Sequence, residues 1–354
     1  MDLMYEYICE SSQVMREIQN NQEEIFRDLH QKYQHKEMQE VILLGSGTSY
    51  NAVLTARDAI ERILKVPVQM YYPVEFTDHI SVLHSSAIAI GVSQAGRSSS
   101  TIDALQKAKK AGMTTICLSA EKDAPIVENA DIYIPLWIGE ESVGPKTKGY
   151  FGSVAELVLL AKEIAKLNHS YTDDMDNIIA DMLSVTDKIR DIAEKSYSWY
   201  KGIKEQLLSS KRMIVIGYGA CMGAMSEGAL KLLEGMGCSV TGYELEEFMH
   251  GIYHAIDQNT YILALGMPGR HQERLYRLLQ YLQDRKHAHI FVVSDRQTSF
   301  ETFVYPFQND ELFSAMEYIV PLQVLARKLS WDQGIDCCQS ADPDFHRLME
   351  SYRY

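Results

Sequence analysis

Three charged residues recur at helical spacing in the second half of this 354-residue chain. Glu227, Lys231 and Glu234 are four and then three positions apart, so on a helix they share one face, directly after the small-residue loop 217–220. The opposite face is apolar and is expected to pack against the core, through Leu230, Leu233 and Met236. Because a carboxylate held beside an ammonium can exchange protons with a bound molecule, the pattern predicts an acid–base site.

Two loops in the first half combine glycine with hydroxyl side chains. The loop 45–49 reads Gly-Ser-Gly-Thr-Ser and follows the apolar run 41–44, and the loop 93–101 reads Ser-Gln-Ala-Gly-Arg-Ser-Ser-Ser-Thr and follows the run 87–92. A helix that starts at such a loop presents unpaired N–H groups, which bind anions. Together the loops predict a phosphate site built from neutral donors.

Two alternatives compete with a phosphate site. A dinucleotide-binding fingerprint (G-x-G-x-x-G) needs a third glycine three positions after the second one. Tyr50 stands at that position after Gly45 and Gly47, and Met222 stands there after Gly217 and Gly219. No nicotinamide or flavin cofactor is therefore expected. The loops could also be tight strand-to-helix turns capped by Ser and Thr. Two hydroxyl-rich loops in one half favour the phosphate site.

Composition and charge narrow the class of protein. Values of 46% hydrophobic and 23% charged residues are ordinary for a globular protein. The net charge of -14, from 48 acidic and 34 basic residues, repels a phosphate backbone, so nucleic acid is not an expected partner. A phosphorylated ligand must therefore be held by local donors.

Other features predict an ordinary reduced protein without a metal. The six cysteines show no C-x-x-C spacing, and the vicinal pair Cys337 and Cys338 is not a usual disulfide, so free thiols are expected. His250 and His254 have helical metal-ligand spacing, but no third ligand is placed. The charged start of the chain and the absence of an 18-residue apolar run predict neither a signal peptide nor a membrane span, hence a cytoplasmic location.

Strand-like runs alternate with helical stretches in both halves, which predicts an α/β fold with parallel sheets. The runs lie at 41–44, 68–72, 87–92, 114–118 and 132–136, and again at 213–216, 261–265 and 290–293. The second block repeats the first with little identity. The predicted parts are an N-terminal helical segment (1–38), a first domain (39–165), a helical connector (166–210), a second domain (211–335) and a tail (336–354) that contributes to the active site.

The motifs together resemble the sugar isomerase (SIS) family, in particular the isomerase half of glucosamine-6-phosphate synthase and the fructosamine-6-phosphate deglycases. The resemblance lies in residues 47–51, 93–96 and 227–234, in His250 with Gly251, and in the run 321–326. It implies two flavodoxin-like SIS domains, no cofactor, and a homodimer or larger assembly whose shared active site binds an open-chain sugar 6-phosphate.

The resemblance also implies roles for individual residues. The phosphate-binding set is Gly47, Thr48, Ser49, Ser93, Gln94 and Ser98. Glu234 corresponds to the base that moves a proton between C1 and C2, with Lys231 as its polar neighbour and Glu227 as a ligand of a sugar hydroxyl or a helix-terminal charge. His250 corresponds to the acid that opens the ring or protonates the leaving group, and in relatives it comes from the other subunit. His254 ranks second for that role because no glycine follows it.

Several positions depart from the family pattern. Ala95 replaces a serine hydroxyl, and Arg97 stands where the synthase has an acid. Lys146 and Lys148 flank a threonine where the family has Ser-Thr-Lys. The synthase has a lysine near its end, whereas no lysine follows Lys328 here and the tail offers His346 and Arg347. We expect Arg97, Lys146, Lys148 and His346 to be substrate contacts.

The expected function is a deglycase that cleaves a phosphorylated sugar–amine conjugate into a sugar 6-phosphate and a free amine. Glutamine-dependent synthesis is not expected, because the chain reaches the SIS-type entry helix at once, without room for a glutaminase domain. Two alternatives are an aminosugar-phosphate deaminase and an aldose–ketose phosphate isomerase. A third, of another class, is a non-catalytic sugar-phosphate-binding regulator. The sequence does not identify the amine.

Overall fold

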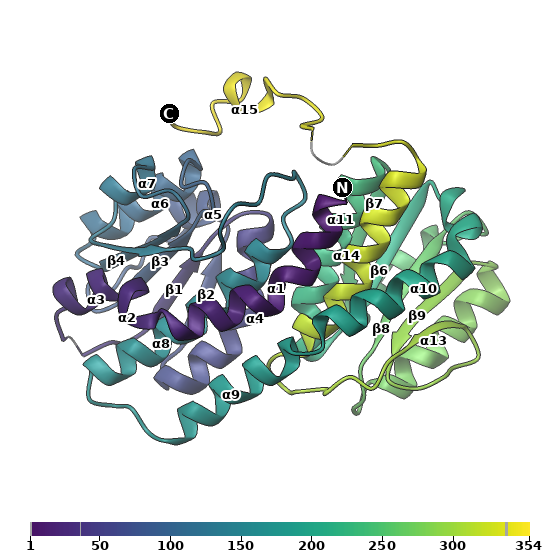
Figure 1. The fold of residues 1–354 in the computed structure, drawn as a ribbon, viewed down its shortest axis with the longest axis horizontal. Coiled ribbons are helices and arrows are strands. Elements are labelled where there is room, and N and C mark those ends of the chain that lie inside the picture. Colours follow the sequence, from purple (N-terminus) through teal and green to yellow (C-terminus); the bar gives the residue numbers. More distant parts are fainter. Residues whose placement is uncertain (1, 36, 337–338) are drawn as a thin grey trace. The chain divides into compact units, whose positions relative to one another are not determined.

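The computed structural model describes residues 2–35, 37–336 and 339–354, so the vicinal pair Cys337 and Cys338 lies outside the described residues. The chain divides into two compact units (Figure 1). The first-sheet unit contains residues 13–141, 148–183 and 340–354, and the second-sheet unit contains residues 1–12, 142–147 and 184–339. These limits fall inside the predicted segments 1–38, 166–210 and 336–354. In the first two segments the limit lies within a helix, α1 (Leu3–Asn20) or α9 (Asp174–Thr186).

The first sheet has five parallel strands in the order β2-β1-β3-β4-β5. They are β1 (Val41–Leu44), β2 (Val68–Tyr71), β3 (Ile88–Val92), β4 (Thr114–Ser119) and β5 (Ile132–Pro135). Every residue of β1 and β3 is buried, since helices cover both faces of the sheet, and this is why these strands read as unbroken apolar runs. The five predicted strands are confirmed.

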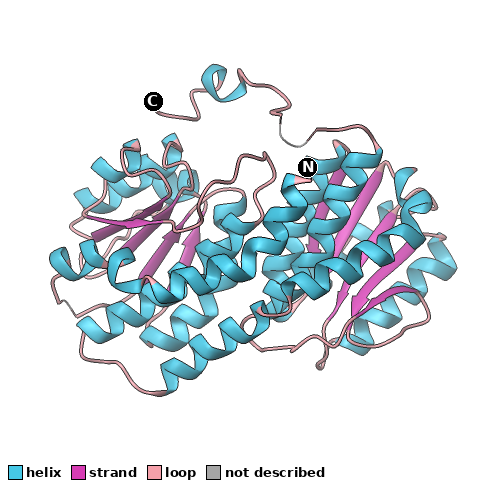
Figure 2. Cartoon of the chain, in the orientation of Figure 1, coloured by secondary structure: helices cyan, strands magenta, loops and turns pink. Residues whose placement is uncertain are grey.

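Helices pack on both faces of the first sheet (Figure 2). On one face, α5 (Pro73–His79), α6 (Ser99–Lys110) and α7 (Pro125–Glu128) share a core with the strands, which includes Ile42, Phe76 and Leu105. On the other face, α4 (Thr48–Leu64) packs against α8 (Lys148–Leu167). The short helices α2 (Gln22–Ile25) and α3 (Arg27–Lys32) also belong to this unit, and α3 contacts β5.

The second sheet repeats the topology of the first, in the order β7-β6-β8-β9-β10. Its parallel strands are β6 (Arg212–Gly217), β7 (Ser239–Glu244), β8 (Tyr261–Gly266), β9 (His289–Ser294) and β10 (Glu301–Val304). The sequence patterns predict β6, β8 and β9 but miss β7 and β10. Both of the missed strands lie at the edges of the sheet.

Two layers of helices cover the second sheet. The helices α11 (Met222–Met236), α14 (Ser314–Asp332) and α10 (Ile189–Leu208) form one layer, in which α14 contacts both of the others. The other face packs against α12 (Leu245–Met249) and α13 (Gln272–Lys286) around a core that includes Ile216, Phe248 and Leu279. Three short helical segments complete the fold: η1 (Gly219–Cys221), η2 (Ile252–Ala255) and α15 (Phe345–Leu348).

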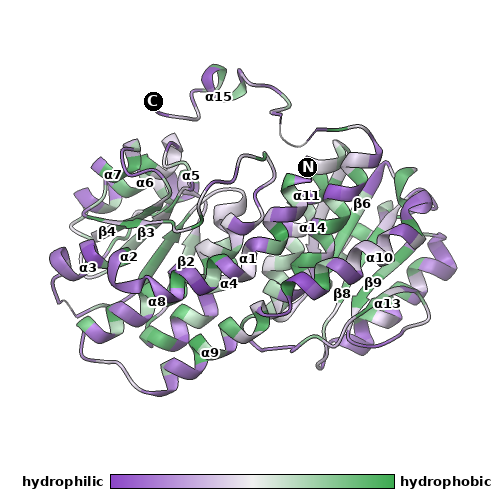
Figure 3. Cartoon of the chain, in the orientation of Figure 1, coloured by the Kyte–Doolittle hydropathy of each residue, from purple (hydrophilic) through white to green (hydrophobic). Residues whose placement is uncertain are grey.

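The distribution of hydropathy follows this layering. Strands of both sheets are mainly hydrophobic, whereas the surface helices alternate between hydrophobic and hydrophilic stripes (Figure 3). Within residues 2–35, 37–336 and 339–354, no helix combines the length and the apolar character needed to cross a membrane. The observed architecture, two parallel five-stranded sheets flanked by helices, confirms the predicted fold class.

Candidate functional site

The carboxyl ends of β1 and β3 bring two helix N-termini together in the first-sheet unit. The two strands are hydrogen-bonded neighbours, and the strand order reverses between them, which is where α/β sheets bind ligands. After β1 the chain turns at Gly47 (φ +58°) into α4, which begins at Thr48. After β3 it passes through the loop 93–98 into α6, which begins at Ser99. The structure therefore places both predicted phosphate loops at one edge of one sheet.

The loop after β3 is held tightly by its own backbone. The N–H of Gly96 donates to the carbonyl of Ser93 at 2.8 Å, and the N–H of Ser93 donates to the carbonyl of Leu118 at 3.1 Å. Gly96 has φ +64°, and a Cβ there would lie 2.4 Å from the Cβ of Ala124 and 2.5 Å from Oγ of Ser119. Only glycine satisfies both the backbone conformation and this close approach.

The predicted donors have distinct surroundings. Ser93 is buried, whereas Thr48, Ser49 and Ser98 are half-buried. The hydroxyl of Thr101 donates to Oγ of Ser98 at 3.0 Å, which orients Ser98 at the N-cap of α6. Hydroxyls and helix N-terminal N–H groups of this kind bind an oxyanion without a positive side chain.

The tail 340–354 docks on the start of α6. The N–H of Ser99 donates to the carbonyl of Ser351 at 3.0 Å, and Oγ of Ser99 donates to the carbonyl of Glu350 at 2.9 Å. The N–H of Arg353 donates to the carbonyl of Arg97 at 2.8 Å. The tail therefore already occupies two donors at the N-terminus of α6.

Of the predicted substrate contacts, Arg97 and His346 both lie where the tail docks: the carbonyl of Arg97 accepts the N–H of Arg353, and His346 packs on Tyr352, which pairs with Ser98. Arg97 pairs with Glu121 at 2.8 Å. His346 stacks on the ring of Tyr352, with 3.9 Å between the ring centroids. Lys148 is buried at the first residue of α8, and Lys146 falls in the second-sheet unit. A substrate that uses Arg97 must compete with its ion pair.

The three charged residues that the sequence places on one face of α11 contact one another in the second-sheet unit. The Nζ of Lys231 lies 2.6 Å from Oε2 of Glu234 and 3.4 Å from Oε1 of Glu227. The side chains of Glu227 and Lys231 are fully buried, and that of Glu234 is 33% exposed. Glu234 is thus the carboxylate of the three that a ligand in solution reaches, and a buried cation supports it from behind.

The prediction for the opposite face of α11 is wrong in part. Leu233 is 44% exposed, whereas Met236 is buried. The face that packs on α14 is made by glycines instead: a Cβ at Gly228 would lie 2.0 Å from Leu322, and one at Gly235 would lie 2.7 Å from the carbonyl oxygen of Ala326. Small residues bring the two helices close, and the buried Glu227–Lys231 pair lies on α11 among them.

His250 lies at the end of α12, at the other end of an edge strand from Glu234. It is exposed, and its N–H donates to the carbonyl of Glu247 at 3.0 Å. The six residues of β7 separate the end of α11 from the start of α12, which corresponds to about 17 Å of strand. The nearby His254 packs its ring on Tyr253, with 4.2 Å between centroids.

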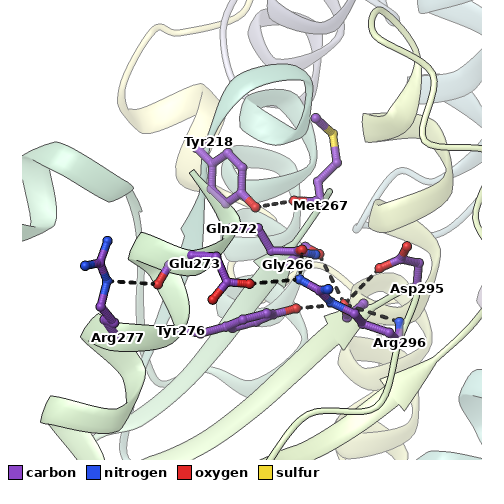
Figure 4. A network of polar contacts seen from close by, with 10 residues as sticks. Tyr218, Gly266, Met267, Gln272, Glu273, Tyr276, Arg277, Asp295 and Arg296 are labelled. Carbon is purple, nitrogen blue, oxygen red and sulfur yellow. Dashed lines mark hydrogen bonds and ion pairs between the residues drawn. The ribbon is translucent and has the colours of Figure 1, made fainter. Parts of the chain in front are cut away.

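A network of polar side chains lies at the carboxyl edge of the second sheet (Figure 4). The hydroxyl of Tyr218 donates to the carbonyl of Met267, and burial raises the pKa of Tyr218. Gln272, at the start of α13, donates to the carbonyl of Gly266 at 2.8 Å and accepts from Arg296. At the edge that corresponds topologically to the phosphate loops, these side chains are therefore already hydrogen-bonded within the chain.

The described residues do not meet the requirements of a cysteine nucleophile or of a metal site. Burial raises the pKa of the Cys221 thiol in the loop after β6, so it is a poor nucleophile. Cys9, Cys117, Cys221 and Cys238 are all free thiols, as predicted for these four. No group of three or more His, Cys, Asp and Glu side chains within the described ranges is arranged to hold a metal ion.

Comparison with known proteins identifies the family. The model of the SIS domain matches residues 35–162 and 206–301, one stretch in each sheet-bearing half of the chain. The chain belongs to the SIS domain family. The resemblance to the SIS family that the sequence motifs predict is confirmed.

Several known proteins are similar to this chain in sequence or in fold. The chain is 24% identical over 310 residues to a glutamine–fructose-6-phosphate aminotransferase of Clostridium tetani, covering 86% of this chain and 51% of the relative. It thus spans about half the length of the curated relatives it matches. A Clostridium difficile protein provisionally described as a phosphosugar isomerase superimposes with a TM-score of 0.90, at 28% identity and 99% coverage of both chains. A glucosamine-6-phosphate deaminase of Thermotoga maritima shares the fold, with a TM-score of 0.74, 18% identity, and 96% and 97% coverage.

Proposed function

We propose that this SIS protein is a deglycase that cleaves a phosphorylated sugar–amine conjugate into a sugar 6-phosphate and a free amine. The observation that carries the proposal is the α11 cluster, in which a reachable carboxylate, Glu234, contacts the wholly buried ammonium of Lys231. In an ordinary ion pair on a helix surface the lysine is in contact with water, and the pair stabilises the helix by only a few tenths of a kcal/mol. Burial of the cation instead fixes the position of Glu234 for work on a ligand.

The second support is the edge of the first sheet. The N-terminus of α4 with Thr48 and Ser49, together with Ser98 at the N-cap of α6, presents neutral groups to a phosphate, whereas the N–H and the hydroxyl of Ser99 are bound by the tail. The net charge of -14 means that the overall field of the chain does not attract a phosphate. Local donors such as these must therefore provide the binding. The proposal requires the phosphate of the substrate to bind at this edge of the first-sheet unit.

The chemistry balances without a cofactor. In an open-chain ketosamine, Glu234 moves one proton from C1 to C2, while the proton of the nitrogen passes to the C2 oxygen. Water then adds to the C1–nitrogen double bond. The C1–N bond breaks, its electron pair leaves with the nitrogen, and His250 protonates that nitrogen as the C1 hydroxyl becomes a carbonyl. The products are an aldose 6-phosphate and a free amine.

The proposed site takes His250 from a second copy of the chain. Within one chain β7 separates Glu234 from His250. Proton transfer needs heavy atoms within about 3 Å of each other, so both side chains must reach the same bound sugar. In a homodimer, His250 at the end of α12 in one copy can reach the sugar bound beside Glu234 of the other copy. Such a dimer agrees with the shared active site that the resemblance implies.

The test is to offer the protein three substrates separately: fructose 6-phosphate, glucosamine 6-phosphate, and fructose 6-phosphate carrying lysine or aspartate at C1. We expect free amine and glucose 6-phosphate from the conjugate, and Glu234→Gln and His250→Ala each to lower turnover by about 100-fold or more. Ammonia from glucosamine 6-phosphate alone would instead make the protein a deaminase. Interconversion of free sugar phosphates without amine release would make it an isomerase, and tight binding without turnover would make it a regulator.

A further inference from the structure

Glu141, which no motif of the sequence singles out, contacts the proposed phosphate loop from behind. It lies between β5 and α8 in the first-sheet unit and is only 7% exposed. Its carboxylate accepts the N–H groups of Lys148 at 3.0 Å and Gly149 at 3.1 Å, and it accepts the side-chain amide of Gln94 at 3.3 Å. One buried carboxylate thus joins the start of α8 to the loop after β3.

This contact determines which way the Gln94 amide faces. An ionised carboxylate only accepts hydrogen bonds, so the NH₂ group of Gln94, and not its oxygen, must face Glu141. One N–H is used on Glu141, and the second remains for an oxygen of a ligand. The negative charge of Glu141 is itself compensated by the N-terminus of α8, where its oxygens accept two successive backbone N–H groups.

Gly149 closes the arrangement from the third side. A Cβ at this position would lie 2.4 Å from Oε1 of Gln94 and 2.8 Å from Oε2 of Glu141. Such distances are shorter than any van der Waals contact, so a larger residue would push the amide or the carboxylate away. The Gln94 backbone is fixed as well, because its carbonyl accepts the N–H of Ala120 at 2.8 Å. The whole residue is therefore oriented before a ligand arrives.

We propose that Glu141 is a positioning residue of the phosphate site, which acts by holding the Gln94 amide with an N–H directed to the phosphate. The inference rests on the proposed function, because it assumes that the loops after β1 and β3 bind the phosphate of the substrate. Glu141 does not touch the ligand; it removes the rotational freedom that Gln94 would otherwise lose on binding.

The first experiment is a double-mutant cycle on binding. The dissociation constants of inorganic phosphate and of fructose 6-phosphate are measured by calorimetry for the wild type, Gln94→Ala, Glu141→Ala and the double variant. We expect each single change to weaken both ligands by roughly tenfold, as for a hydrogen bond to a charged group, and the double change to cost no more than either single one.

Two further variants separate positioning from plain stability. Asp310→Ala is the matched control, because Asp310 also accepts two successive N–H groups, from Leu312 and Phe313, but lies in the second-sheet unit. It should lower the melting temperature without changing phosphate affinity. Gly149→Ala keeps both polar partners and provides a better helix former, yet it should weaken phosphate binding. Should Glu141→Ala fail to fold, Glu141→Gln keeps the volume and should weaken binding to a smaller degree.

The outcomes distinguish the two proposals. If Gln94→Ala weakens binding while Glu141→Ala and Gly149→Ala do not, or if the effects of Gln94→Ala and Glu141→Ala multiply, the positioning role is wrong and the phosphate site stands. If Gln94→Ala leaves both dissociation constants unchanged, the phosphate site itself is misplaced. If the wild type binds neither ligand, the proposed function fails with it.

Discussion

Lys231 holds its ammonium where the structure leaves no access to water. Both Lys231 and its partner Glu227 are fully buried, and each is one turn from the other on α11. Burying an ion pair is expensive, and such a pair adds little net stability compared with apolar residues. The pair is therefore better explained by what it positions, namely Glu234, which contacts Lys231 from the exposed end of the group.

The first prediction at this scale concerns the free energy of unfolding. Lys231→Met should lower it by about 3–5 kcal/mol in urea titrations, because Glu227 then keeps a buried charge without its nearest cation. Adding Glu227→Gln should restore part of that loss. Lys204→Met, which removes a half-exposed partner of Asp332, serves as the control and should change stability by less than about 0.5 kcal/mol. Equal stability of the single and double variants would contradict a coupled buried pair.

At the scale of elements, the packing of α11 on α14 depends on glycine. At Gly235 a Cβ would lie 2.7 Å from the backbone oxygen of Ala326, and backbone cannot move aside as a side chain can. The close approach brings α11 against α14, most of whose residues are buried. Rigid packing of this kind keeps a catalytic side chain in place.

Gly235→Ala should therefore destabilise the protein by about 1–3 kcal/mol, as other overpacking changes do. Gly202→Ala is the control, because a Cβ at Gly202 on α10 meets no atom within 4 Å. That change should raise stability by up to about 1 kcal/mol through helix propensity. Melting curves of the two variants, recorded side by side, check the prediction, and equal shifts would show that α11 and α14 separate easily.

Sequence reasoning recovers the interior strands and misses the edges for a physical reason. β3 is buried at every residue, so its run of apolar residues is unmistakable. In β10 only Phe303 is buried, and in β7 only Val240, so neither has a continuous apolar signal. The prediction that Leu233 is packed is wrong for a related reason: glycines, which carry no hydrophobic signal, form the contact face of α11.

In the candidate site, too, some features can be predicted from the sequence and others cannot. The loops at Gly47 and Gly96 are visible in the sequence because positive φ angles and close approaches demand glycine, and the spacing of Glu227, Lys231 and Glu234 is visible because a helix makes it meaningful. Contacts between distant stretches leave no such local trace. Glu141 on Gln94 and the tail on Ser99 are of this kind.

At the scale of the whole molecule, the proposed function needs two copies of the chain. If each site combines Glu234 of one copy with His250 of the other, a mixed dimer of Glu234→Gln and His250→Ala contains one intact site and one doubly altered site. Random exchange gives half mixed dimers, so the mixture should recover about a quarter of wild-type activity. The measurement is turnover after the two inactive variants are unfolded and refolded together. No recovery in a mixture shown to contain mixed dimers would mean that each site is built within one chain.

The two sheets share one strand order, but at the carboxyl edge of the second sheet Tyr218, Gln272 and Arg296 hydrogen-bond within the chain. If the loops of the first sheet bind the phosphate and Glu234 on α11 supplies the base, as proposed, the two repeats differ in what they contribute: one provides loops and the other provides a helix face. A repeated strand order would then not imply two equivalent binding sites in one chain.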